Sequence, residues 1–309
     1  MAFMYALPGA VAEGLIWGLM AIGVYLSYKI LDIADLTVDG SICTGACVCA
    51  VLLAVGVPVW LCVVAAFLAG ALAGIVTGLL HTALGIPSIL AGILTQLMLY
   101  SVNLCILGGK SLVAIDPRAA QLMVHMSSNP RSILSMVILV SITIIALWLF
   151  FYTEIGLTLK STGDNPDMSR AQSVNVKLNQ VIGLALSNGI VALAGAILAQ
   201  YKGSANINDG RGAIVIGLAA IFIGLSVSLK IKPNFVVSLI GVVGGGIVYY
   251  IVYNFVILLG LKTDYLKMLS AIIVAVFLAV PYVKNEYFPK QYDLHPDGAQ
   301  DQVGGGKHA

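Results

Sequence analysis

Charged residues are scarce in this sequence. They make up 10% of the 309 residues, whereas hydrophobic residues make up 60%, and the mean hydropathy is +1.00. This composition excludes an ordinary soluble domain and is typical of a polytopic helical membrane protein. The formal net charge of +2 is too small to indicate a nucleic-acid partner. The five cysteines all lie in apolar runs, so we interpret them as small buried apolar side chains rather than as a metal or redox site.

Motifs of catalysis and cofactor binding are also missing. Gly109-Lys110-Ser111 resembles the end of a phosphate-binding loop, but Leu104 occupies the position that requires the earlier glycine. No histidine pair has metal-ligand spacing, and neither a Gly-x-Ser-x-Gly elbow nor an intramembrane carboxylate pair is present. The sequence therefore predicts a protein that is not an enzyme and that holds no metal, nucleotide or other cofactor of its own.

Long apolar runs dominate what is present, and each can cross a hydrocarbon core of about 30 Å. They predict an all-α polytopic membrane protein with about nine transmembrane helices, within a range of eight to ten. The N-terminus lacks a basic region, so no cleavable signal peptide is expected. Residues 1–283 are predicted to form one transmembrane domain, and the charged tail 284–309 is predicted to be disordered. The predicted spans are residues 10–29, 41–57, 59–81, 88–107, 132–152, 179–200, 213–229, 234–260 and 265–283.

A weak internal repeat divides the spans into two halves, residues 10–107 and 179–283. Each half contains a span, an Asp-Gly pair (Asp39-Gly40 or Asp209-Gly210), a short apolar span, a proline and then a glycine-patterned span. Small residues at helical spacing allow close helix packing. Each half has four spans, and one extra span separates the halves, so they would have opposite orientations. The sequence thus predicts an inverted repeat, a plan of transporters whose pathway lies at the interface of the halves.

The most polar stretch between spans is the loop 153–178, which must lie in water because buried charges are costly in hydrocarbon. Asn165 is a predicted N-cap, and Pro166 fits the first position of a helix. This amphipathic helix could lie on the lipid surface or dock into a soluble partner. Its apolar face is small and its positive charge sparse, which favours docking. The predicted docking residues are Gly163, Asp164, Asn165, Pro166, Met168, Ala171 and Val174.

Uncharged and acidic polar residues at membrane depth have two interpretations. They can form hydrogen bonds between helices or cap helices, or they can line a hydrophilic translocation pathway. The residue types alone leave both open. The candidate pathway residues are Thr37, Asp39, Ser41, Gln96, Asn188, Asn206, Asn208 and Asp209.

Three segments resemble the permeases of ABC importers of the branched-chain amino acid and ribose type. Residues 33–41 resemble the N-terminal signature of that family, and the form Asp-Leu-Thr-Val-Asp-Gly-Ser is similar to its tryptophan/tyrosine transporter branch. Residues 156–175 resemble the cytoplasmic coupling motif, and residues 187–203 resemble the block that follows it. Lys160 and Ser161 depart from the arginine and alanine that are more frequent in the motif.

The resemblance implies a homodimer in a bacterial inner membrane, surrounded by lipid, with the pathway between two copies or within each. Each copy would dock its 163–175 helix into one of two cytoplasmic ATPase subunits, which bind ATP and magnesium. A separate extracytoplasmic binding protein would deliver a small solute to the loops 108–131 and 201–212. The likeness to the tryptophan/tyrosine branch implies an aromatic or other amino acid as that solute. The loop 153–178 and the C-terminus would be cytoplasmic and the N-terminus external.

Two other classes of protein remain as alternatives. A secondary transporter or channel would work without partners, but ion coupling usually needs intramembrane charge, and Glu13 is almost the only candidate in the spans. A membrane-embedded enzyme would need a catalytic constellation, which the sequence lacks. Basic residues are divided almost evenly between the two sides of the predicted spans, so they do not set the orientation.

Overall fold

The computed structural model describes residues 2–115, 130–228 and 234–258, together with single residues at 122, 124, 268, 271, 272, 274, 275 and 279. The predicted tail, residues 284–309, lies outside the described residues. The predicted ninth span, residues 265–283, is described only at isolated positions, so the count of nine spans stays a prediction.

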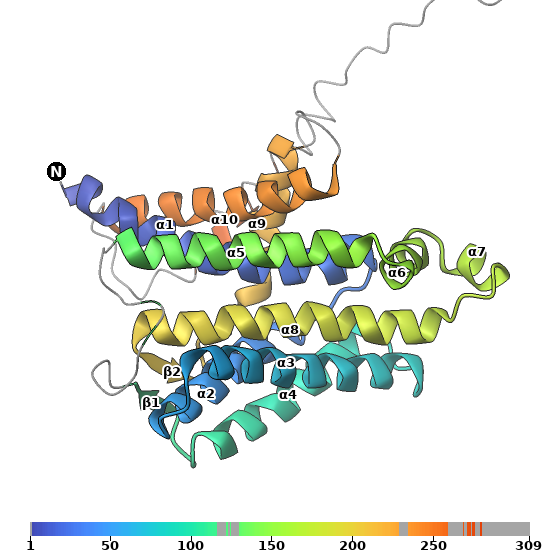
Figure 1. Ribbon diagram of the computed structural model, residues 1–309, viewed down its shortest axis with the longest axis horizontal. Helices are drawn as coiled ribbons and strands as arrows, with labels where there is room; N and C mark the ends of the chain where they lie inside the picture. Colours follow the sequence, from blue (N-terminus) through green and yellow to red (C-terminus); the bar gives the residue numbers. More distant parts are fainter. Residues whose placement is uncertain are drawn as a thin grey trace, which may run out of the picture.

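The described chain is a bundle of apolar helices, which confirms the all-α polytopic membrane class (Figure 1). Six helices in the described residues are long and apolar enough to cross a membrane, and two more are apolar but shorter. They lie close to the first eight predicted spans. The six are α1 (Ala2–Tyr25, continued by the π-helix η1, Leu26–Ile30), α3 (Val59–Thr82), α4 (Ser88–Ile106), α5 (Pro130–Phe151), α8 (Val176–Lys202) and α10 (Phe235–Leu258). The shorter two are α2 (Val38–Ala54) and α9 (Ala213–Ser228).

Glycines bring the central helices into close contact. A Cβ atom at Gly74 of α3 would overlap the carbonyl oxygen of Leu184 on α8, and one at Gly245 of α10 would overlap that of Ala220 on α9. The sequence prediction that these glycine-patterned helices pack closely is therefore confirmed. Helix α3 lies along α8 and α1 lies along α10, while α2 packs on α8 and α9 packs on α1.

The chain between η1 and α2 is irregular and reaches into the bundle. Gly92 of α4 lies against the backbone of Leu36, where an added Cβ would be 2.7 Å from the amide nitrogen. Non-helical backbone at membrane depth needs polar partners within the protein. The polar residues between η1 and α2 supply such partners, which is why a polar sequence separates these two apolar helices.

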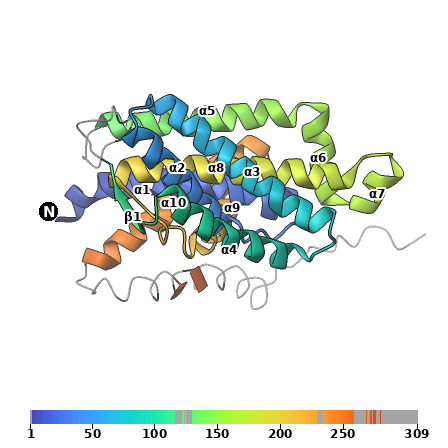
Figure 2. The ribbon, with the colours of Figure 1, turned by 90° about the horizontal axis from the view of Figure 1, so that it is seen from below.

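A small antiparallel pair of strands closes one end of the bundle. Strand β1 (Leu112–Ala114) pairs with β2 (Ser204–Asn206), with Leu112 opposite Asn206. Both ribbon views place these strands at the opposite end of the bundle from the short helix α7, Pro166–Ala171 (Figures 1 and 2). The sequence predicted only polar loops in these two regions.

The cysteines follow the predicted burial with one exception. Four of the five are buried, but Cys105 is exposed on the outward face of α4, so the interpretation of all five as buried side chains is wrong at that position. Cys43 also makes specific contacts, because its Sγ accepts a hydrogen bond from the amide of Gly210 at 3.1 Å.

Candidate functional site

The polar loop forms a helical hairpin, which we define as α6 (Glu154–Asp164) followed by α7 (Pro166–Ala171). Asn165 separates the two helices, and its side chain accepts a hydrogen bond from the amide of Met168 at 2.9 Å. The predicted N-cap and the predicted position of Pro166 are thus confirmed. Helix α6 was not anticipated; it begins after Thr153, whose hydroxyl accepts a hydrogen bond from the amide of Gly156.

The predicted continuous helix over residues 163–175 is wrong. Gly163 and Asp164 are the last residues of α6, and α7 ends at Ala171. Ser173 adopts a positive φ of 63°, which helical residues do not have, so the chain turns before α8. Val174 therefore does not extend the apolar face of the helix that carries Met168.

Helix α6 is attached to the bundle, whereas α7 projects from it (Figure 1). A Cβ at Gly163 would overlap the carbonyl oxygen of Ile30, and the amide of Asn179 on α8 donates a hydrogen bond to the Thr162 hydroxyl at 3.0 Å. On α7, the Met168 side chain is 60% exposed. The hairpin thus presents a small apolar tip on a base fixed to the bundle.

Several candidate pathway residues form a buried polar network. The amide nitrogen of Asn188 donates a hydrogen bond to the Asp35 carboxylate at 2.6 Å, and its amide oxygen accepts one from the Ser41 hydroxyl at 2.6 Å. The backbone amide of Thr37 donates to Asp35, and its hydroxyl bonds to that of Thr77 at 2.8 Å. All five residues are buried. In this conformation Thr37, Ser41 and Asn188 therefore join helices to one another.

Asp35 and Thr77 are the two network residues that the sequence did not single out. The polar interruption at residues 32–41 was a signal for Asp35, but no local pattern ranks Asp35 above Asp32 or Asp39. The structure separates them, since Asp35 is 2% exposed whereas Asp32 is an exposed residue with a positive φ of 56°.

The two predicted Asp-Gly segments meet in the structure. Each Asp39 carboxylate oxygen accepts a 2.9 Å hydrogen bond from one backbone amide, that of Gly212 or that of Ile214 at the start of α9. A Cβ at Gly210 would overlap the carbonyl oxygen of Asp39. Asp39 therefore caps α9. The prediction that the Asp-Gly residues cap the helices that follow them is wrong for Asp39, which lies in the first turn of α2.

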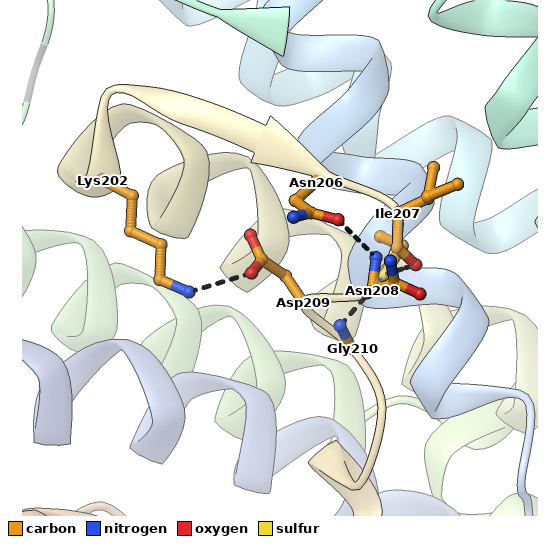
Figure 3. Close-up of polar contacts among 7 residues, drawn as sticks. Lys202, Asn206, Ile207, Asn208, Asp209 and Gly210 are labelled. Carbon is orange, nitrogen blue, oxygen red and sulfur yellow. Dashed lines mark hydrogen bonds and ion pairs between the residues drawn. The ribbon is translucent and has the colours of Figure 1, made fainter. Parts of the chain in front are cut away.

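Asn208 and Asp209 lie in the turn between β2 and α9, and Asn206 is the last residue of β2. The Asn206 side chain accepts a hydrogen bond from the Asn208 amide at 2.9 Å, and the Lys202 ammonium pairs with Asp209 at 3.2 Å (Figure 3). These polar groups shape an accessible turn near the strands.

Two cavities flank this turn, and Arg211 lines both. One, which we call the aromatic cavity, has a volume of about 400 Å³; the other, of about 440 Å³, includes Asp39, Gln96 and Asn103 in its lining. Four of the eight candidate pathway residues thus line a cavity: Asn208 and Asp209 line the aromatic cavity, and Asp39 and Gln96 line the second. The sequence missed Arg211 and the aromatic residues of the first cavity, which are Trp17, Tyr249, Tyr250 and Tyr253.

Comparison with known proteins assigns this arrangement to a family. The profile described as the branched-chain amino acid transport system / permease component matches residues 9–280, which is most of the chain. The chain belongs to this permease family. It is a multi-pass membrane protein and a permease of the ABC type that the sequence motifs resembled.

Individual relatives agree with that assignment. The chain is 35% identical over 277 residues to the tyrosine transport system permease protein of Clostridioides difficile (strain R20291), covering 89% of this chain and 91% of that protein. It is 30% identical to an uncharacterised protein of Rickettsia prowazekii (strain Madrid E), over 92% of this chain and 99% of that protein. A nucleoside ABC transporter permease protein of Lactococcus lactis is 33% identical over 84 residues, 27% of this chain and 26% of that protein. No solved structure matches the chain.

Proposed function

We propose that this permease is the membrane subunit of an ATP-driven, binding-protein-dependent importer of a small solute. Two ATPase subunits on the cytoplasmic side would bind ATP and magnesium, and two copies of this chain would form the membrane unit. A separate extracytoplasmic protein would supply the solute at the strand end of the bundle. We place the protein in a bacterial inner membrane, with the hairpin and the C-terminus in the cytoplasm and the N-terminus outside.

The α6–α7 hairpin is the observation that carries this proposal. Its base is fixed to η1 and α8 by the contacts of Gly163 and Asn179, so a force on α7 reaches the transmembrane helices. Its tip exposes Met168, a flexible apolar side chain suited to a groove on a partner protein. Met168, Asp164 and Asn165 are the residues that we expect to contact the ATPase.

We further propose that the two halves are related as an inverted repeat. The packing of α3 on α8 has a counterpart in the packing of α1 on α10, as expected if the halves exchange under pseudo-symmetry. The contact of Asp39 with the turn before α9 also supports the inverted repeat, because it brings the two Asp-Gly segments together at the junction of the halves.

An aromatic amino acid is the solute that we favour. The support is the likeness to a protein named as a tyrosine transport system permease. A partner-independent channel or secondary transporter is disfavoured because it would leave the exposed apolar tip of α7 without a role.

Co-purification of the permease with a candidate ABC ATPase subunit from the same organism tests the docking. The double variant Asp164→Ala plus Met168→Asp is expected to reduce the bound ATPase at least tenfold, because it removes the apolar anchor and places a charge at the contact. Leu84→Asp is the matched control. Leu84 is 68% exposed in the turn after α3. This turn lies at the same end of the bundle as the hairpin, because Gly78 near the end of α3 packs on Val181 near the start of α8.

Normal assembly of the double variant with the ATPase would show that the hairpin is not the docking site. Solute movement by the reconstituted permease without nucleotide would instead refute the ATP-driven importer. The control variant is expected to keep the wild-type amount of bound ATPase.

A further inference from the structure

The aromatic cavity lies at the end of the bundle opposite the hairpin, between α1, α10 and the turn before α9. We propose that it is a substrate subsite that holds an aromatic α-amino acid, with the ring against its tyrosines and the carboxylate on Arg211. This inference rests on the proposed function, since it assigns a place on the import pathway to the solute.

The wall of the cavity supplies a surface for a flat ring. Trp17 of α1 and Tyr250 of α10 are stacked, with centroids 5.9 Å apart and an interplanar angle of 21°. Tyr253 stacks on Tyr249 at 6.3 Å and lies 5.7 Å from Tyr250. Trp17, Tyr249 and Tyr250 are buried, whereas Tyr253 is only partly buried. A ligand ring that packs on Tyr253 would gain the attraction of an aromatic pair, which an aliphatic side chain would not.

The size of the cavity suits one small ligand. A volume of about 400 Å³ falls at the lower end of the range of roughly 300–1,000 Å³ found for small-molecule sites. Val215, Ile216 and Ala271 add to the apolar part of the lining. The combination of a mainly apolar wall with a few convergent charges is typical of ligand sites.

The charges of the cavity favour a carboxylate. Lys202 and Asp209 form an ion pair at 3.2 Å, with 37% and 21% of their side chains exposed. Within the part of the chain that the structure describes, Arg211 makes no ion pair, so its guanidinium is the one charged group of the lining that is left for a ligand. Glu13 of α1 interacts electrostatically with Lys202, Tyr250 and Tyr253 and adds a carboxylate beside the cavity. A guanidinium binds a carboxylate through two parallel hydrogen bonds, which an ammonium group cannot do.

Asp209 provides the complementary group for the ligand's ammonium. It lines the same cavity, and its carboxylate already attracts one ammonium, that of Lys202 (Figure 3). The cavity thus offers separate partners for both charges of a zwitterion and for its ring. An aromatic amine without a carboxylate would leave the positive charge of Arg211 without a partner. A neutral sugar would form an ion pair with neither Arg211 nor Asp209.

Arg211 is also held by the opposite half of the protein. Its neighbours Gly210 and Gly212 both donate backbone hydrogen bonds to α2, to Cys43 at 3.1 Å and to Asp39 at 2.9 Å. Arg211 lines the second cavity as well as the first. Movement of α2 relative to α9 would therefore move the Arg211 guanidinium, the proposed partner of the ligand's carboxylate, from one cavity towards the other. Such a movement would link the site to a change of access.

Binding of radiolabelled L-tyrosine to the full-length permease in lipid nanodiscs tests the site without any partner subunit. We expect saturable binding, with L-phenylalanine as an effective competitor. Tyramine, which lacks the carboxylate, and L-isoleucine, which lacks the ring, are expected to compete at least tenfold less well. Arg211→Gln should weaken L-tyrosine binding at least tenfold, and Arg211→Lys should recover part of that loss. Lys29→Gln, an exposed charge removed elsewhere, is the control and should bind as wild type.

Each other outcome would overturn the inference. Equal competition by tyramine would remove the role of Arg211, and equal competition by L-isoleucine would remove the role of the aromatic wall. Wild-type binding by Arg211→Gln would place the ligand elsewhere. If the complex with the ATPase imports solute but the nanodisc permease does not bind L-tyrosine, this inference fails while the proposed function stands. If L-tyrosine binds but no ATPase complex forms, the proposed function fails instead.

Discussion

Asp39 joins α2 to α9 through a helix cap, and its removal should destabilise the whole bundle. The carboxylate accepts two backbone hydrogen bonds of 2.9 Å, from Gly212 and Ile214. Hydrogen bonds to a charged group contribute about 1.5–3 kcal/mol each, and the loss of an N-cap costs about 0.5–2 kcal/mol. The two hydrogen bonds are themselves the N-cap of α9, so these two contributions are not added together. We therefore expect Asp39→Ala to lower the free energy of unfolding by about 3 kcal/mol.

Thermal unfolding in detergent, followed by tryptophan fluorescence, measures this effect. At about 2–4 °C per kcal/mol, the Tm of Asp39→Ala should fall by roughly 6–12 °C. Asp39→Asn keeps one neutral acceptor oxygen, so it should lose roughly half as much. Asp167→Ala is the control, because its pair with Arg170 is exposed and such pairs contribute about 0–1 kcal/mol.

A Tm of Asp39→Ala within about 4 °C of the wild type, the largest shift that the control allows, would refute the reasoning. It would mean that the α9 amides find equivalent partners once the carboxylate is gone. A loss by Asp39→Asn equal to that of the alanine variant would show that charge, rather than acceptor geometry, stabilises the junction.

Three further predictions follow from local geometry. Gly74→Ala should lower the Tm by several degrees, because the added Cβ would overlap the α8 backbone. At Gly244 the added Cβ would meet no atom within 4 Å, so Gly244→Ala should leave the Tm unchanged or raise it. Equal Tm changes in the two variants would contradict the packing. Asn165→Ala should destabilise α7 by about 1 kcal/mol and weaken ATPase binding without changing the Tm of the bundle; Asn165→Asp should preserve both. Asn188→Leu should destabilise the bundle, and Asp35→Asn in the same chain should restore part of the loss; strictly additive Tm changes would show that the two residues are not coupled.

Local patterns in the sequence were sufficient for the helices and for the start of α7. Continuous apolar runs bounded by prolines, glycines and polar residues place eight helices within a few residues of their observed positions. Asn165 and Pro166 specify a helix start by neighbouring backbone chemistry alone, so they could be read directly. Val174 shows the limit of this approach, since helical spacing continued beyond the turn at Ser173.

The sequence by itself determined that this protein is a helical membrane bundle with one polar loop that contains a capped helix, because hydrophobicity and capping act between near neighbours. Only the tertiary structure decided which polar residues work together. Asp35 meets Asn188, and Asp39 meets Gly212, across more than 150 residues of chain. The aromatic cavity likewise joins Trp17 to Tyr250. Such partners are selected by the packing of whole helices, and no pattern within one segment records them.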